Sequence, residues 1–329
     1  MTNDSKDDIP PGERGLRLEG RAIAEPGARP TRINRWEADA GTTSPIDTVA
    51  VEEPLEIRLA WTDAQGEARE QSISITMRTP GNDLELAVGF LHGEGIVTDP
   101  RQLAKVDHCG PAVGPHQLRN VVKVTLADAS QLDLGRLERH FYTTSSCGVC
   151  GKTSLEALRV QTRYRCASSA MTLSAAALGA LPNELRRHQE VFGRTGGIHA
   201  SALFDAAGRL GAIREDVGRH NALDKLLGSE FMAGRLPLND FGVLVSGRAS
   251  FELMQKAVMA GASMLAAVGA PSSLAVELAR DFDVILVGFL RQDRFNVYSG
   301  AERLLALEAS AGPAPRHPGT PAENQESSP

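Results

Sequence analysis

The sequence is poor in cysteine, in aromatic residues and in positive charge. Its 329 residues include four cysteines, too few for a scaffold held together by disulfides. Aromatic residues make up 5%, and 35 Lys and Arg against 41 Asp and Glu give a formal net charge of −6. This balance excludes an overall basic field that would hold nucleic acid or an anionic membrane. An anionic ligand would need a local cluster of arginines instead.

Long hydrophobic runs are also missing. An apolar run such as 284–290 is far shorter than the roughly 20 residues of a membrane-spanning helix. Residues 1–8 are polar and acidic and lack the apolar core of a signal peptide. We therefore expect a soluble, cytoplasmic protein with reduced thiols, and neither nucleic acid nor membrane among its partners.

The sequence does contain one segment with two closely spaced cysteines, FYTTSSCGVCGKTS at residues 141–154. Cys147 and Cys150 stand between glycines, Lys152 adds a positive charge, and a helix is predicted to begin near Thr153. A nearby cation or helix amino terminus lowers the pKa of a thiol and favours the nucleophilic thiolate. We interpret the segment as a reactive cysteine loop.

Two other interpretations of the C-x-x-C spacing are weaker. Half of a structural zinc site would need a second pair of ligands, but Cys109 and Cys166 are isolated and have no companion at ligand spacing. A dithiol oxidoreductase would show a thioredoxin-type pattern of strands and helices around the motif, which is not evident.

A zinc-dependent deaminase is a further alternative. Such enzymes combine a His or Cys, a Glu two residues later and a P-C-x-x-C segment. His92 and Glu94 with Cys147 and Cys150 resemble this set, but Ser146 stands where proline is required. We therefore expect no permanently bound metal.

The composition and hydrophobic pattern divide the chain into five parts and predict an α/β fold. The parts are a disordered N-terminal arm (1–45), a small α+β domain (46–140), the reactive cysteine loop with a linker helix (141–165), a larger layered α/β domain (166–308) and a disordered tail (309–329).

Alternating and helical periodicities locate the elements of the two domains. Strands are predicted at 55–61, 72–77, 121–126, 200–204, 210–214, 241–245, 264–268 and 284–287. Helices are predicted near 84–91, over 173–191 with a break at Pro182, after Asp216, from 251 and over 272–280.

Polar loops with arginines stand at the junctions of the second domain. Ligands of layered α/β sheets gather where strands end, glycines let a ligand approach the backbone, and arginine forks onto phosphate. These loops predict a nucleotide or pyrophosphate pocket. The candidate residues are Gly197, His199, Asp216, Arg219, His220, Ser246, Arg248, Ser250, Arg291 and Arg294. The alternative is a set of turn glycines, surface arginines and structural histidines, with Asp216 and Ser250 as plain helix caps.

The ordered motifs over about residues 45–305 resemble the FdhD/NarQ family, the formate dehydrogenase accessory sulfurtransferases. The resemblance rests on SCGVCG at 146–151, GGIHA at 196–200, EDVGRHNALDKL at 215–226, SGRAS at 246–250 and VGF at 287–289. It implies a larger domain similar to the cytidine deaminase fold and a homodimer.

The resemblance also implies a function. Cys147 would receive sulfur from a cysteine desulfurase as a persulfide, with Cys150 assisting. The sulfur would pass to the Mo (or W) bis-guanine-dinucleotide cofactor, Mo-bis(molybdopterin guanine dinucleotide), as bound substrate, before that cofactor enters formate dehydrogenase. GDP would mimic the cofactor.

The family's cofactor-binding stretch maps onto Phe289, Leu290, Arg291, Gln292, Asp293 and Arg294. A cysteine loop that swings between the donor and the pocket would fit this function. A molybdenum cofactor-binding chaperone that moves no sulfur is the non-catalytic alternative.

Overall fold

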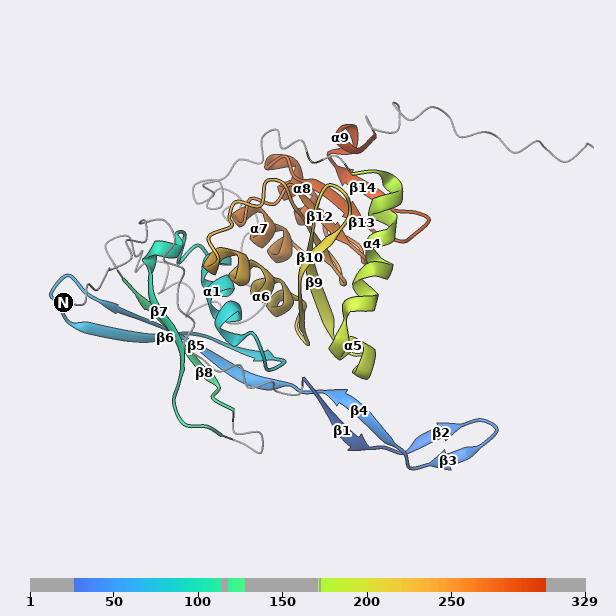
Figure 1. Cartoon of the computed structure of the whole chain (residues 1–329), viewed down its shortest axis with the longest axis horizontal. Coiled ribbons are helices and arrows are strands. Elements are labelled where there is room, and N and C mark those ends of the chain that lie inside the picture. Colours follow the sequence, from blue (N-terminus) through green and yellow to red (C-terminus); the bar gives the residue numbers. More distant parts are fainter. Residues whose placement is uncertain (1–26, 114–117, 128–170, 172, 306–329) are drawn as a thin grey trace, which may run out of the picture.

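Two sheets from different halves of the chain lie on either side of a shared pair of helices (Figure 1). The computed structural model describes residues 27–113, 118–127, 171 and 173–305. The reactive cysteine loop, residues 1–26 and the expected tail at 309–329 lie outside the described residues. No helix in the described part is long and apolar enough to span a membrane.

The first sheet has the strand order β6-β5-β8-β7. Its strands are β5 (Glu53–Thr62), β6 (Ala68–Arg78), β7 (Leu103–Cys109) and β8 (Val121–Leu126). The 3-10 helix η1 (Pro100–Gln102) precedes β7. Alternate residues Leu55, Ile57 and Leu59 are buried against α1 (Asp83–Gly93), as a strand with one covered face requires. The predicted hairpin and the strand at 121–126 are confirmed, whereas β7 was not predicted.

The second sheet has the order β10-β9-β11-β12-β13-β14. Its strands are β9 (His199–Phe204), β10 (Leu210–Asp216), β11 (Gly242–Val245), β12 (Met264–Ala267), β13 (Ile285–Gly288) and β14 (Asn296–Ser299). The central three strands are parallel, and the remaining pairings are antiparallel. β11, β12 and β13 are buried along their whole length, as expected for parallel strands covered on both faces.

Helices cover both faces of this sheet (Figure 1). One face packs on α6 (Arg219–Met232), α7 (Phe251–Met259) and α8 (Ser273–Asp281). The opposite face packs on α4 (Ala175–His188), which is followed by α5 (Glu190–Thr195). The short helix α9 (Ala301–Leu305) ends the described chain. The mixed α/β class is confirmed, and the likeness to cytidine deaminases stays a prediction.

The predicted helix break at Pro182 is wrong, because α4 continues through this residue. Proline removes one backbone donor and strains the preceding turn. Leu178, Leu181 and Leu185 are nevertheless buried together against the sheet. Burial of this apolar stripe offsets the cost of the lost hydrogen bond.

The predicted domains meet along α1 and α6. A Cβ on Gly89 would lie 1.9 Å from the Asp224 carbonyl oxygen, and one on Gly228 would lie 1.9 Å from that of Glu85. The two helices therefore touch backbone to backbone. Phe231 of α6 belongs to the core of the first sheet, so the two halves share a packed boundary. The predicted domain boundary at residue 140 lies outside the described residues.

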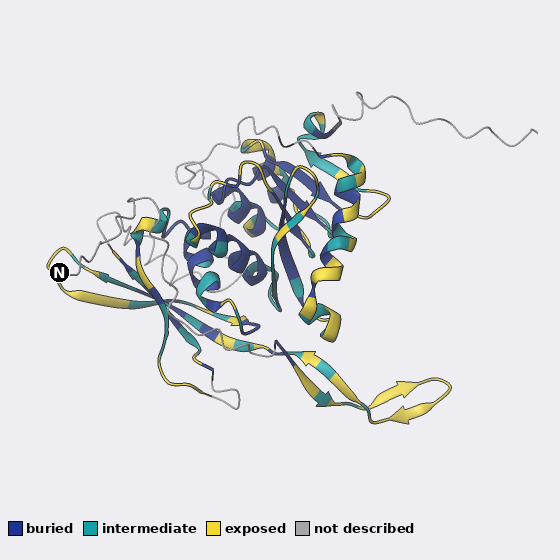
Figure 2. Cartoon of the chain, in the orientation of Figure 1, coloured by how far each residue is buried: buried dark blue, intermediate teal, exposed yellow. Residues whose placement is uncertain are grey.

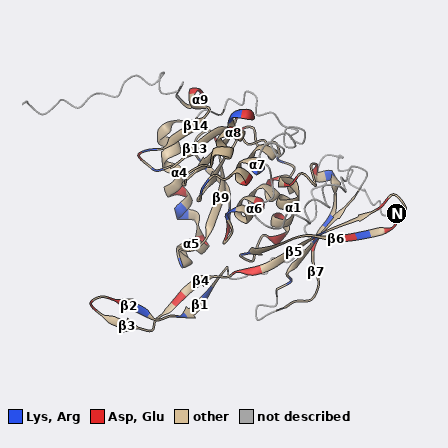
Figure 3. Ribbon diagram, turned by 180° about the vertical axis from the view of Figure 1, so that it is seen from behind, with Lys and Arg blue, Asp and Glu red and all other residues tan. Residues whose placement is uncertain are grey.

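Strands occupy part of the segment predicted to be disordered up to residue 45. β1 (Ala28–Arg32) pairs with β4 (Ile46–Ala50), and β2 (Arg35–Glu37) pairs with β3 (Gly41–Thr43). This arm projects from the body and is largely exposed, with Trp36 73% exposed (Figure 2). Charges of both signs lie along it (Figure 3). A ribbon with two solvated faces has no apolar stripe that could reveal it in the sequence.

Candidate functional site

The predicted loops meet at one edge of the larger sheet, where the parallel strands end. The Ser246 N–H donates to the Ala200 carbonyl at 2.9 Å, and the Gly269 N–H donates to the Gly247 carbonyl at 2.8 Å. The Phe289 N–H in turn donates to the Gly269 carbonyl at 2.9 Å. The loops after β11 and β13 therefore lie next to one another.

His199 and Ser246 sit side by side at this edge. The Ser246 hydroxyl accepts a hydrogen bond from the Ala200 N–H at 2.9 Å and lies 3.4 Å from Nδ1 of His199. Partial burial lowers the pKa of His199, and the positive charge of Arg219 lowers it further. Both effects favour the neutral ring.

The first turn of α6 adds Arg219 and His220. Nε of Arg219 is buried and has no hydrogen-bond partner among the described residues. Nε2 of His220 lies 3.3 Å from the Ser250 hydroxyl. Burial lowers the pKa of His220 to about 4, with Arg219 as the next cause. Ser250 occupies the N-cap position of α7 but makes no side-chain capping bond, and its hydroxyl contacts both His220 and the Glu252 carboxylate.

Two predicted binding residues are buried instead of facing a ligand. Asp216 has no exposed surface, and its carboxylate accepts from the backbone N–H groups of Thr79 and Gly218 and pairs with Lys225. The N-cap residue of α6 is Gly218, so Asp216 is not the cap either. Leu290 is a fully buried member of the sheet core. Both residues therefore serve the packing of the fold and do not line the pocket.

The remaining residues of the segment 289–294 are accessible. Phe289 is 44% exposed and has a left-handed backbone with φ of 53°. Nη1 of Arg291 donates to the Val268 carbonyl at 2.7 Å, and the Gln292 side chain accepts from Asn183 Nδ2 at 2.9 Å. Asp293, Arg294 and, in the neighbouring loop, Arg248 are exposed.

A pocket of about 510 Å³ opens beside these loops. Its lining includes three predicted residues, Gly197, His199 and Ser246. The rest of the wall comes mainly from α4 and α5 and was not predicted; it includes Asn183, Arg186, Gln189 and Phe192. The basic run at 186–188 was the one available signal. Polar residues at the end of an amphipathic helix usually mean only a solvated face.

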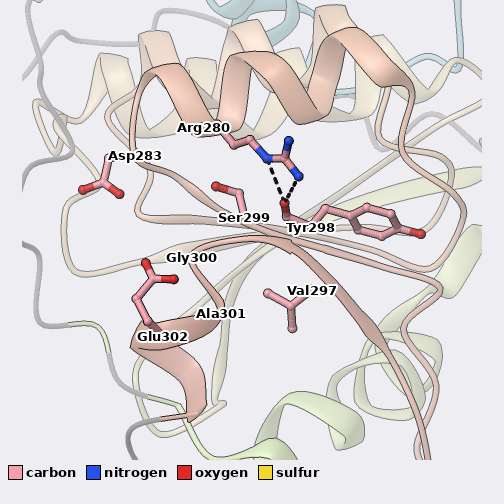
Figure 4. Close-up of a pocket in the computed structure, with 8 residues that line it drawn as sticks. All are labelled: Arg280, Asp283, Val297, Tyr298, Ser299, Gly300, Ala301 and Glu302. Carbon is pink, nitrogen blue, oxygen red and sulfur yellow. Dashed lines mark hydrogen bonds between the residues drawn. The ribbon is translucent and has the colours of Figure 1, made fainter.

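A second hollow of about 350 Å³ lies between α8, β14 and α9 (Figure 4). It contains none of the predicted site residues. Its main cation, Arg280, donates to the Tyr298 carbonyl from Nε and Nη2, at 3.4 and 3.3 Å. We therefore place the candidate site at the other pocket.

His92, the histidine of the deaminase alternative, is a packed core residue. Its ring lies 4.7 Å from that of Phe231, and Nδ1 donates to the Val97 carbonyl at 3.1 Å. Burial lowers its pKa to about 4. The neighbouring Glu94 lies 3.6 Å from Lys256 Nζ. Cys147 and Cys150 lie outside the described residues, so the structure lends this alternative no support.

The sequence is similar to curated bacterial and archaeal proteins along most of its length. It is 49% identical over 283 residues to the sulfur carrier protein FdhD of Streptomyces coelicolor, covering 85% of this chain and 96% of the relative. Identity to the protein of the same name from Mycobacterium tuberculosis is 48% over 277 residues, or 83% and 97% of the two chains. The sulfur carrier protein FdhD of Picrophilus torridus is 42% identical over 259 residues, which cover 79% of this chain and 92% of the relative.

A solved structure shares the fold. It is a protein of Desulfotalea psychrophila described as a candidate formate dehydrogenase accessory protein, with a TM-score of 0.61 and 24% identity. The match covers 85% of this chain and 100% of that one. The model of the FdhD/NarQ family matches residues 50–305. The resemblance found in the motifs is thus confirmed, and the chain belongs to the FdhD/NarQ family.

Proposed function

We propose that this protein is a sulfur carrier that loads a molybdenum or tungsten cofactor for formate dehydrogenase. The observation that carries the proposal is the gathering of the predicted polar loops around one pocket, together with a glycine-framed dithiol in the same chain. The similar proteins of other organisms are named sulfur carrier protein FdhD, which supports the first half of the proposal.

The chemistry starts at Cys147. Its thiolate attacks the outer sulfur of a persulfide on a cysteine desulfurase, the donor's S–S bond breaks, and the donor cysteine leaves as a thiolate. Cys147 then carries the additional sulfur. Cys150 assists, and the glycines of the loop let it move between the donor and the pocket.

The accessible residues of the site serve the cofactor. Arg248, Arg291 and Arg294 are exposed cations at the strand ends and suit the phosphates of a guanine dinucleotide. Gly197, His199 and Ser246 line the pocket, while Arg219, His220 and Ser250 extend the polar surface beside it. Phe289, Gln292 and Asp293 complete the rim, and GDP is the simplest mimic. The proposal also includes a cytoplasmic homodimer.

Intact-protein mass spectrometry without reductant tests the sulfur step. The protein is incubated with a cysteine desulfurase and cysteine, and a gain of one sulfur is expected in the wild type and lost in Cys147→Ala. Cys150→Ala shows whether the second thiol is needed. Cys109→Ala is the matched control, because burial raises the pKa of Cys109 and makes it a poor nucleophile. An adduct that persists without Cys147 would contradict the proposal.

A non-catalytic chaperone for the cofactor is the second candidate, because the pocket would serve it equally well. Such a protein would still activate formate dehydrogenase after Cys147→Ala. A sulfur carrier would lose that activation.

A further inference from the structure

Gln189, in the wall of the 510 Å³ pocket, has a buried amide that the fold leaves unused. The residue is 6% exposed, and its Nε2 has no hydrogen-bond partner among the described residues. Leaving such a buried donor unsatisfied destabilises the protein. A group on a bound ligand would remove this cost.

The side chain of Gln189 does not cap the helix that follows it. It lies between α4 and α5 and is the N-cap residue of α5, yet its side chain makes no capping hydrogen bond. The carboxylate of Glu215 does this instead, accepting from the N–H groups of Val191 and Phe192 at 2.9 Å each. The Gln189 amide is therefore left to the pocket.

Arg186 and Phe192 form a flat surface in the same pocket that suits a heterocyclic ring. The guanidinium carbon of Arg186 lies 3.8 Å from the centroid of the Phe192 ring, and both residues line the pocket. Guanidinium planes and aromatic rings are the protein surfaces on which nucleobases stack. Amide and hydroxyl groups of Asn183 and Ser246 complete a mixed lining.

The pocket is tied to the segment 289–294. Arg291 donates to the carbonyl of Val268, and Gln292 accepts from Asn183; Val268 and Asn183 both line the pocket. If the base of a nucleotide occupied the pocket, the phosphates of that nucleotide would lie near the exposed arginines of the segment 289–294. The volume is within the usual range for a small-molecule site.

We propose that this pocket binds a flat ring with a carbonyl next to a ring N–H, the edge that guanine and pterins share, and that Gln189 selects it. Nε2 of Gln189 donates to the ring carbonyl, its Oε1 accepts from the ring N–H, and the ring stacks on the outer face of the Arg186–Phe192 pair. The inference rests on the proposed function and names the part of the cofactor that enters the pocket.

Calorimetric titration of the full-length protein with GDP, ADP and neopterin tests this assignment. We expect GDP, neopterin or both to bind at least about tenfold more tightly than ADP, as one buried, well-placed hydrogen bond allows. In Gln189→Leu that preference should fall to about threefold or less, and Phe192→Ala should weaken all binding. Arg187→Ala is the matched control: Arg187 lies in the last turn of α4, two residues before Gln189, is outside the pocket lining and pairs with Glu184.

The three ligands separate the possible sources of the ring. Preference for GDP alone assigns the guanine half of the cofactor, and preference for neopterin alone assigns the pterin half. Equal binding of ADP, or an unchanged preference in Gln189→Leu, would overturn the proposal. If Gln189→Leu does not fold, Gln189→Asn withdraws the amide by one methylene and should also lose the preference. Ring selectivity without a persulfide on Cys147 would reject the sulfur carrier function and leave this assignment standing.

Discussion

Nζ of Lys225 lies 2.8 Å from the Asp216 carboxylate at the joint between the two halves of the chain, and the two side chains are 2% and 0% exposed. The same ammonium donates to the Thr79 carbonyl at 2.8 Å, while Asp216 accepts from the Thr79 N–H at 3.1 Å. The residue that follows β6 is thereby fixed to β10 and α6. Removing one member leaves an uncompensated buried charge.

We therefore expect Lys225→Met to lower the free energy of unfolding by about 3–5 kcal/mol. Urea denaturation followed by circular dichroism measures this loss. Arg101→Ala, at the exposed pair with Asp99, is the control and should leave the denaturation midpoint unchanged. Equal effects of the two substitutions would show that the buried pair is not a structural joint.

Contact between α1 and α6 depends on glycine. Gly89→Ala should force the helix backbones apart and destabilise the fold by about 1–3 kcal/mol or more. Gly193→Ala in α5 is the matched control, because nothing lies within 4 Å of its added methyl group. It should stabilise the protein by about 0.5–1 kcal/mol through helix propensity. Thermal melts of both variants decide the matter, and a neutral Gly89→Ala would mean that the helices separate without cost.

His92 should make stability depend on pH. Its folded pKa of about 4 lies below the ordinary value of 6.5, so the unfolded chain binds more protons between these pH values. The stability is intact above pH 6.5 and should fall by up to about 3 kcal/mol as the pH drops toward 4. Asp224, whose pKa burial raises to about 6, acts with the opposite sign.

The contribution of His92 is isolated by the difference between the wild type and His92→Gln. The variant should lose less stability from pH 7 to pH 4.5 in urea denaturation. Parallel pH profiles would show that His92 is not the titrating group.

Phe289 combines an exposed ring with a left-handed backbone, which costs a non-glycine residue about 1–2 kcal/mol. Asn adopts this conformation more readily, so Phe289→Asn should keep or raise the melting temperature. If the ring stacks on the cofactor, GDP affinity should fall about tenfold or more. Unchanged GDP affinity would reduce Phe289 to a surface residue.

The thiols should differ in reactivity. Burial raises the pKa of Cys109, whereas glycines and a lysine surround the pair Cys147 and Cys150 in the sequence. Brief alkylation with iodoacetamide at pH 7, followed by peptide mass spectrometry, should label Cys147 well before Cys109. Faster labelling of Cys109 would contradict the reactive-loop interpretation.

The main elements were predictable where the hydrophobic pattern is simple. The strands at 121–126 and 200–204 and the buried run at 284–287 appear close to their expected bounds, because alternation or continuous burial leaves a direct trace in the residues. The extension of β10 to Asp216 was missed, because its last residues are polar. They remain in the strand through backbone pairing with β9.

The loops of the site were predictable for a topological reason. Parallel strands bring their carboxyl ends to one edge, so polar loops after β11 and β13 must meet. A pocket at these loops was predicted, but the part of its wall that α4 and α5 contribute was not. Gln189, between these helices, and Val268 line the same pocket although they are far apart in the sequence.

The amino-acid sequence by itself determined the mixed α/β class, the glycine-framed cysteines and the ordered motifs of the FdhD/NarQ family. Each of these features can be recognised from residues that are close together in the sequence. Only the tertiary structure decided that Asp216 and Leu290 are buried supports, that α1 packs on α6, that residues 28–50 form a paired arm and that Gln189 faces a pocket. These features depend on contacts between distant segments, and burial and hydrogen-bond partners follow from such contacts alone.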